Sequence, residues 1–207
     1  MAMNFSDMML FCFCFSYFFV PLQHKNDRQI MHPLDKFKFC PACGSGNWTE
    51  NNFKSKRCAD CGFVYYANPC SATAVFILNS RNELLVVRRA KEPAMGTLDL
   101  VGGFVDMYET IEEGMRREIK EETGLDVGEM TYLFSTPNQY LYSGMLVHTL
   151  DADFLVRVPD DVKPEAADDA ADCQWIAIEN INPADFGLTS IRRAVERFLK
   201  ERVWERY

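Results

Sequence analysis

Two Cys-x-x-Cys pairs place the tightest constraint on how the first part of this chain can fold. Cys40/Cys43 and Cys58/Cys61 are separated by fourteen residues, and a glycine follows the second cysteine of each pair. Four thiolates close a tetrahedral zinc site and leave no coordination position open for catalysis. Two disulfides or redox pairs are the alternative. The spacing predicts a structural zinc ribbon over residues 37–69, because so short a module has too little core to fold without a staple.

The charge balance restricts the class of partner. The chain has 30 acidic and 22 basic residues and a formal net charge of -8. An acidic surface repels a phosphate backbone, so we expect no non-specific nucleic-acid binding. A small nucleotide bound through metal ions is compatible with this charge. Cysteines reserved for zinc favour a reducing, cytoplasmic location.

The first thirty residues differ in character from the rest. The run from Met8 to Val20 is almost entirely apolar, but thirteen residues are too few to span a bilayer as a helix. A signal peptide would carry basic residues before this run, where the only charge is Asp7. A poor export signal and a peripheral anchor are alternatives. We expect residues 1–30 to be a non-native or disordered leader, with Met31 as the initiator and no stable membrane insertion.

Beyond residue 70 the pattern alternates between strands and helices. Segments rich in β-branched and aromatic residues predict strands at residues 72–78, 83–89, 131–135, 146–156 and 173–178. Helices are expected at residues 110–123 and 190–204, the second with Thr189 as its N-cap. These elements predict an α+β domain over residues 70–207, an α/β/α sandwich with a mixed sheet.

Carboxylates on the first of these helices are the main functional signal. At ~100° per residue, one broad outer face holds Glu112, Glu113, Arg116, Arg117 and Lys120. The opposite face, which should meet the sheet, holds Ile111, Gly114, Met115 and Ile119. Glu118, Glu121 and Glu122 fall on the same inward half.

Three carboxylates on an inward stripe would repel one another and lose hydration. A solvated acidic helix end is the alternative, but the outer face already carries the charges suited to pairing within the helix. Divalent cations with oxygen ligands are the usual way to stabilise such a cluster, and Mg²⁺ is often bound together with substrate phosphates. The Gly102–Gly103 pair before the helix indicates a tight loop near the ligand.

This stretch resembles the Nudix box. Gly103, five residues, Glu109, seven residues and then the run from Arg117 to Leu125 (REIKEETGL) fill every specified position. The resemblance implies a loop–helix–loop that binds Mg²⁺ or Mn²⁺. Its implied catalytic residues are Glu118, Glu121, Glu122 and Arg117, of which the glutamates are the metal ligands, while Arg117 and Glu109 mainly brace the loops. It also implies one later acidic ligand. Asp169, six residues before Trp175, is the best match, with Asp168 and Asp172 as neighbours; a solvated loop is the alternative.

The family resemblance also implies the chemistry: water attacks a pyrophosphate between a nucleoside and another group. A zinc ribbon before such a domain is similar to the bacterial NADH pyrophosphatases, which implies a homodimer and assigns Gly103 and Phe104 to substrate binding. Residues 135–143 match the serines and first proline of their S-Q-P-W-P-F-P-x-S signature, but the glutamine, tryptophan and two prolines are missing. Tyr140 keeps an aromatic, so the resemblance assigns it to substrate binding, with packing on the strand edge as the alternative. The resemblance favours an NADH- or NAD-like dinucleotide, and the departures from the signature keep ADP-ribose, FAD or a nucleotide sugar as the alternative.

Two other classes of function are compatible with parts of the sequence. A Nudix-fold nucleotide sensor would not need all three glutamates of an intact box. A nucleic-acid adaptor would use basic side chains on the ribbon, namely Lys36, Lys38, Lys54, Lys56 and Arg57. Its catalytic box would then have no role. An enzyme is the hypothesis that uses both features of the sequence.

Overall fold

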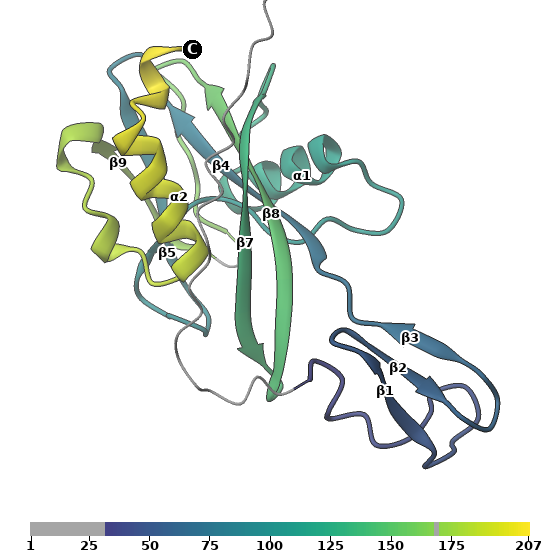
Figure 1. Ribbon diagram of the computed structural model, residues 1–207. Helices are drawn as coiled ribbons and strands as arrows, with labels where there is room; N and C mark the ends of the chain where they lie inside the picture. The colour runs from purple at the N-terminus through teal and green to yellow at the C-terminus, as the bar shows by residue number, and fades with distance from the viewer. Residues whose placement is uncertain (1–31, 168–169) are drawn as a thin grey trace, which may run out of the picture. The chain divides into compact units, whose positions relative to one another are not determined.

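The computed structural model describes residues 32–167 and 170–207 (Figure 1). The expected leader, Asp168 and Asp169 lie outside these ranges. Within them, no helix is both long and apolar enough to cross a membrane.

The cysteine-rich segment forms a small antiparallel sheet of three strands. These are β1 (Trp48–Asn52), β2 (Ser55–Cys58) and β3 (Val64–Tyr66), with β2 in the centre. Trp48 packs with Cys40 and Cys58 in a core of its own, and its ring stacks on Phe63 at 6.2 Å between centroids. This core is small, which agrees with a module whose stability depends on its cysteines.

The rest of the chain builds a mixed six-stranded sheet. Its strands are β4 (Cys70–Leu78), β5 (Glu83–Arg89), β6 (Leu98–Asp99), β7 (Thr131–Tyr142), β8 (Met145–Arg157) and β9 (Ala170–Ala177). The order is β6-β5-β4-β8-β7, and β9 also pairs with β5. Only β4 and β8 run parallel among these pairs, which confirms the mixed sheet.

Two helices cover opposite faces of this sheet (Figure 1). The alternation along β4 explains how: Phe76 faces the core beneath α2 (Thr189–Lys200), whereas Val75 faces the core beneath α1 (Ile111–Thr123). Phe76 and Phe198 of α2 stack at 4.0 Å between ring centroids. Short 3-10 turns at Ile178–Asn180, Pro183–Asp185 and Val203–Glu205 complete the chain. The predicted α/β/α sandwich is confirmed.

Strand β6 was not expected, and β9 begins at residue 170 instead of 173. Three further details differ from the sequence-based expectation. β7 extends to Tyr142 instead of ending at residue 135, because it pairs with β8 along its whole length through the tight turn at Ser143–Gly144. Helix α2 ends at Lys200, and its N-cap is Leu188, so Thr189 makes no capping bond. Ile111, expected against the sheet, is 39% exposed, because it lies in the first turn of α1.

Candidate active site

The loop between β6 and α1 owes its path to two glycines. A Cβ on Gly102 would overlap the carbonyl oxygen of Thr73 on β4. A Cβ on Gly103 would lie 2.5 Å from Oε1 of Glu118. The glycines therefore let the backbone press against β4 while the Glu118 carboxylate rests on the loop, as the glycine pair predicted.

The helix that follows has well-defined ends. Thr110 accepts a hydrogen bond from the Glu113 backbone, and the Glu113 side chain accepts one from the Thr110 N–H, which forms a capping box. Gly124 ends the helix in the left-handed conformation, with φ +70°. These caps define the ends of α1, and the packing of Met115 and Ile119 in the core sets its rotation and hence the direction of each glutamate.

Arg117 connects the acidic groups of the site. Its guanidinium donates to both oxygens of Glu109 at 2.8 and 3.0 Å, to Glu118 at 2.8 Å and to Glu121 at 3.0 Å. It also donates to the carbonyl of Phe104 at 2.9 Å. Its hydrogen bonds, first of all that to Glu109, hold the pKa of Arg117 above its ordinary value, and Arg117 lowers the pKa of Glu109. This arrangement ties the loop to the helix.

The three box glutamates have different environments. Glu122 is 7% exposed and accepts a hydrogen bond from the Gly102 N–H at 3.4 Å. Glu118 is also largely buried, with 14% of its side chain exposed, but Glu121 is 46% exposed at the edge of the helix. The prediction of an inward carboxylate is thus right for two of them and wrong for Glu121, which lies ~60° around the helix from Glu118 and faces Arg117.

These carboxylates do not form a closed metal site by themselves. Among the described residues, the only group of three or more His, Cys, Asp or Glu whose ligand atoms all lie within 4.8 Å of one another is the four cysteines. Arg117 bridges Glu118 and Glu121, and this bridge satisfies part of their charge. The metal-ligand role of the glutamates stays a prediction.

Residues 165 and 167 contact the end of α1. The Glu165 N–H donates to the Thr123 carbonyl at 2.9 Å, and the Ala167 N–H donates to the Glu122 carbonyl at 3.1 Å. Burial raises the pKa of Cys173 on β9 to about 11, with Asp172 and Glu122 contributing. Asp172 is exposed. The role predicted for Asp169, which lies outside the described residues, stays a prediction.

A pocket of about 240 Å³ opens beside the glycine loop. Three residues predicted to bind substrate line it together: Gly103, Phe104 and Tyr140. Asn138 and Tyr142 of β7 also contribute, and the rings of Tyr140 and Tyr142 meet edge to face at 6.5 Å. The long β7–β8 hairpin therefore brings residues of the stretch 135–143, which matches the signature in part, to the pocket beside the glycine loop.

Sequence reasoning missed the acidic residues buried in and near this pocket. Asp99, Asp151 and Asp153 are at most 6% exposed. Asp99 pairs with Arg89 at 2.5 Å, yet burial raises its pKa to about 6. Burial raises the pKa of Asp153 to about 7. The available signal was the pair of aspartates at alternate positions in an otherwise apolar stretch of β8, where both side chains point to one face.

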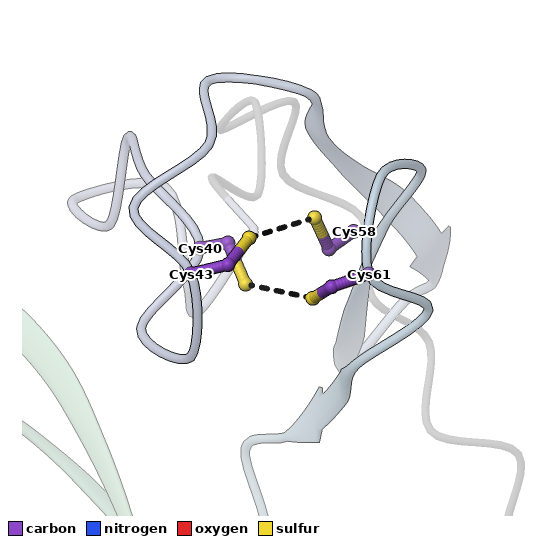
Figure 2. A group of neighbouring side chains, drawn as sticks. All are labelled: Cys40, Cys43, Cys58 and Cys61. Atoms are coloured by element: carbon purple, nitrogen blue, oxygen red, sulfur yellow. Dashed lines mark hydrogen bonds between the residues drawn. The ribbon is translucent and has the colours of Figure 1, made fainter.

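The four ribbon cysteines form a compact cluster (Figure 2). Sγ of Cys40 lies 3.7 Å from that of Cys61, and Cys43 and Cys58 are separated by the same distance. A tetrahedron with Zn–S bonds of about 2.3 Å has edges of about 3.8 Å. All described cysteines are free, so the alternative of two disulfides is not formed. The geometry of the cluster fits a zinc ion bound by all four thiolates.

The fold and the box define a class of protein. The NUDIX domain family matches residues 68–198, and the chain belongs to this family. It is similar to the NAD-capped RNA hydrolase NudC of Vibrio vulnificus (strain CMCP6), with 28% identity over 173 residues, 83% of this chain and 62% of that protein. The corresponding protein of Deinococcus radiodurans is 29% identical over 77% of this chain and 55% of its own length. The chain spans about 60% of the length of such relatives.

Solved structures support the fold. A NUDIX hydrolase from Nitrosomonas europaea superposes with a TM-score of 0.59 at 20% identity, covering 81% of this chain and 93% of that chain. The NUDIX domain of Shewanella oneidensis NrtR, complexed with ADP ribose, gives a TM-score of 0.54 at 16% identity over 67% of this chain and 90% of that chain. At these identities the likeness is one of fold.

Proposed function

We propose that this Nudix pyrophosphatase uses Mg²⁺ or Mn²⁺ to hydrolyse the pyrophosphate of a nucleoside diphosphate linked to another moiety, with an NADH- or NAD-like dinucleotide as the favoured substrate. The observation that carries the proposal is the shared position of Gly103. This residue lines the pocket and also supports the Glu118 carboxylate of the box. A nucleotide in the pocket would thus have its phosphates beside the acidic helix.

The oxygen donors of the box suit a hard divalent cation. Bound there, the ion would offset charge on the phosphate oxygens and lower the pKa of the attacking water. Arg117 and Glu109 hold the loop and helix in register, so they position the donors. Under this proposal the metal ligands are Glu118, Glu121, Glu122 and Asp169. The four ribbon cysteines hold zinc as a structural ion.

Aromatic side chains support the choice of a dinucleotide. Phe104 is 45% exposed at the pocket, and Tyr140 stands on the β7 wall, so both offer a face to a nucleobase or nicotinamide ring. The curated relatives bear the name NAD-capped RNA hydrolase, which describes a substrate with such a dinucleotide at its end. Asn138 lies where the NADH pyrophosphatase signature has an indole, so ADP-ribose, FAD and nucleotide sugars belong in the same substrate screen.

The test is turnover of these compounds with Mg²⁺ or Mn²⁺ by wild type and Glu122→Gln. We expect Glu122→Gln to lose at least about 10–100-fold in kcat. Mutation of a residue that only hydrogen-bonds to a metal ligand already costs this much, and Glu122 is proposed as a ligand itself. Its metal-free thermal midpoint should be unchanged or higher, because the substitution neutralises a buried carboxylate. Glu112→Gln, on the exposed face of α1, is the matched control. Near-normal turnover of Glu122→Gln at saturating Mg²⁺ would contradict the proposal.

A further inference from the structure

One of the carboxylates that line the pocket is satisfied only in part by the protein. Asp151 on β8 lines the pocket and is 6% exposed. Its Oδ1 accepts a hydrogen bond from the Thr149 hydroxyl at 2.6 Å, and the only other side chain that lowers the pKa of this carboxyl is Ser190, among the described residues. Burial raises its pKa. A desolvated carboxylate of this kind is stabilised by a donor from outside the protein.

A second polar group faces the same space. Ser190, in the first turn of α2, lines the pocket and is 2% exposed. It lies close enough to Asp151 to offset part of that rise in pKa, but its hydroxyl reaches hydrogen-bonding geometry with no group of the described chain. Buried hydroxyls normally have a partner. Ser190 thus places an available donor and acceptor beside the Asp151 acceptor.

A second buried carboxylate of the pocket, that of Asp99, does have hydrogen-bond partners for both of its oxygens. One of its oxygens pairs with Arg89 at 2.5 Å, and the other accepts from the Leu100 N–H at 2.9 Å. Both oxygens of Asp99 are therefore satisfied by the protein. Asp151 and Ser190 differ from Asp99 in this respect, and Ile191 and Ala74 supply apolar surface nearby.

We propose that Asp151 and Ser190 form a specificity site for a ring substituent in which an amino group adjoins a hydrogen-bond acceptor. The Asp151 carboxylate accepts from the amino group, and the Ser190 hydroxyl donates to the neighbouring acceptor. Adenine presents this pair at its amino group and ring nitrogen, and nicotinamide presents it in its carboxamide. The assignment rests on the proposed function, because it concerns the ring of that substrate.

Binding measurements on mononucleotides test the site without requiring turnover. Adenosine monophosphate is compared with inosine monophosphate, which lacks the amino group, and nicotinamide mononucleotide with nicotinic acid mononucleotide, in which a carboxylate replaces the amide. Calorimetry on the full chain should show a preference of at least about tenfold for the amino partner in one pair. The pair that shows it identifies which ring occupies the site.

Two variants separate recognition from folding. In Asp151→Asn the side chain can itself donate to a carbonyl, so the preference should fall to about threefold or less, or invert. Asp153→Asn is the matched control: it is buried on the same strand but does not line the pocket, and it should keep the full preference. Ser190→Ala should weaken binding of the preferred mononucleotide several-fold. Thermal unfolding verifies that each variant is folded.

Failure of the specificity site and failure of the proposed function give different experimental outcomes. Equal affinity within both pairs for wild type, or a full preference retained by Asp151→Asn, would overturn the specificity site even if dinucleotides are hydrolysed. A preference that Asp151→Asn abolishes and Asp153→Asn keeps would support it. Failure of wild type to hydrolyse any dinucleotide with Mg²⁺ or Mn²⁺ would instead count against the proposed function, while the binding data still decide the site.

Discussion

Asp153 has a carboxyl group that is almost completely enclosed. One oxygen accepts from the Thr136 hydroxyl at 2.8 Å, and the other has no hydrogen-bond partner in the described chain. Burial raises its pKa from 3.8 to about 7, opposed by Thr136 and Arg197. The folded protein therefore binds a proton more tightly than the unfolded chain, so stability is present below the unfolded pKa and falls as pH rises towards about 7.

We predict that Asp153→Asn removes this pH dependence. The variant should gain stability over wild type as pH rises from 4 to 8, by up to about 4 kcal/mol, the free energy that corresponds to such a pKa difference. Urea unfolding of both proteins across this range measures the effect. A wild-type protein whose free energy of unfolding increases from pH 5 to pH 8 relative to Asp153→Asn would contradict the assignment.

At this same scale, the sequence placed Glu118 and Glu122 correctly on the inward side of the helix, because helical periodicity alone sets that side. It misplaced Glu121, since a broad inward half does not resolve a difference of about 60°. Asp151 and Asp153 were missed for a different reason. A polar residue in an alternating strand normally faces solvent, and only the position of β8 beside β4, inside the sheet, buries it.

Helix α1 is held at its start by a reciprocal pair of bonds. We predict that Thr110→Ala lowers stability by about 0.5–2 kcal/mol, because the Glu113 N–H loses its acceptor. Thr189→Ala is the matched control: Thr189 is exposed in the first turn of α2 and makes no capping bond, so its loss should change stability by less than about 0.5 kcal/mol. Equal effects of the two substitutions in thermal or urea unfolding would show that the capping box has no special role.

The elements themselves were predictable where one periodicity dominates. The boundaries of β5 agree with the expectation at both ends, and α1 differs by a single residue. β7 is longer than expected: residues 135–143 carry a proline and several polar side chains, and they join the strand by pairing with β8. The predicted N-cap of α2 was wrong for a related reason. Thr189 has a side chain suited to capping, but the helix already begins at Thr189, one residue earlier than a cap at that position requires.

At the scale of the whole molecule, two kinds of core stabilise the chain. The mixed sheet is enclosed by two large apolar clusters, whereas the buried cluster of the ribbon consists of Trp48 packed on Cys40 and Cys58. The parallel pairing of β4 with β8, which sets the sheet order, joins segments about eighty residues apart, as in Cys70 with Thr149, and could not be read from local pattern. The cysteine spacing, by contrast, predicted the cluster, because two Cys-x-x-Cys pairs that bind one metal must bring their four thiolates together.

These two cores should separate when the metal is removed. We expect one zinc per chain by elemental analysis, and strong chelation should abolish amide-exchange protection in β1–β3 while β4 and β8 stay protected. Cys40→Ser and Cys58→Ser should each lose the zinc, because three thiolates and a hydroxyl leave the tetrahedron incomplete. Cys70→Ser and Cys173→Ser, outside the cluster, should keep one zinc per chain. If Cys40→Ser and Cys58→Ser both retain full metal content and β1–β3 protection, the ribbon is stabilised by its own packing and the four-cysteine zinc site is wrong.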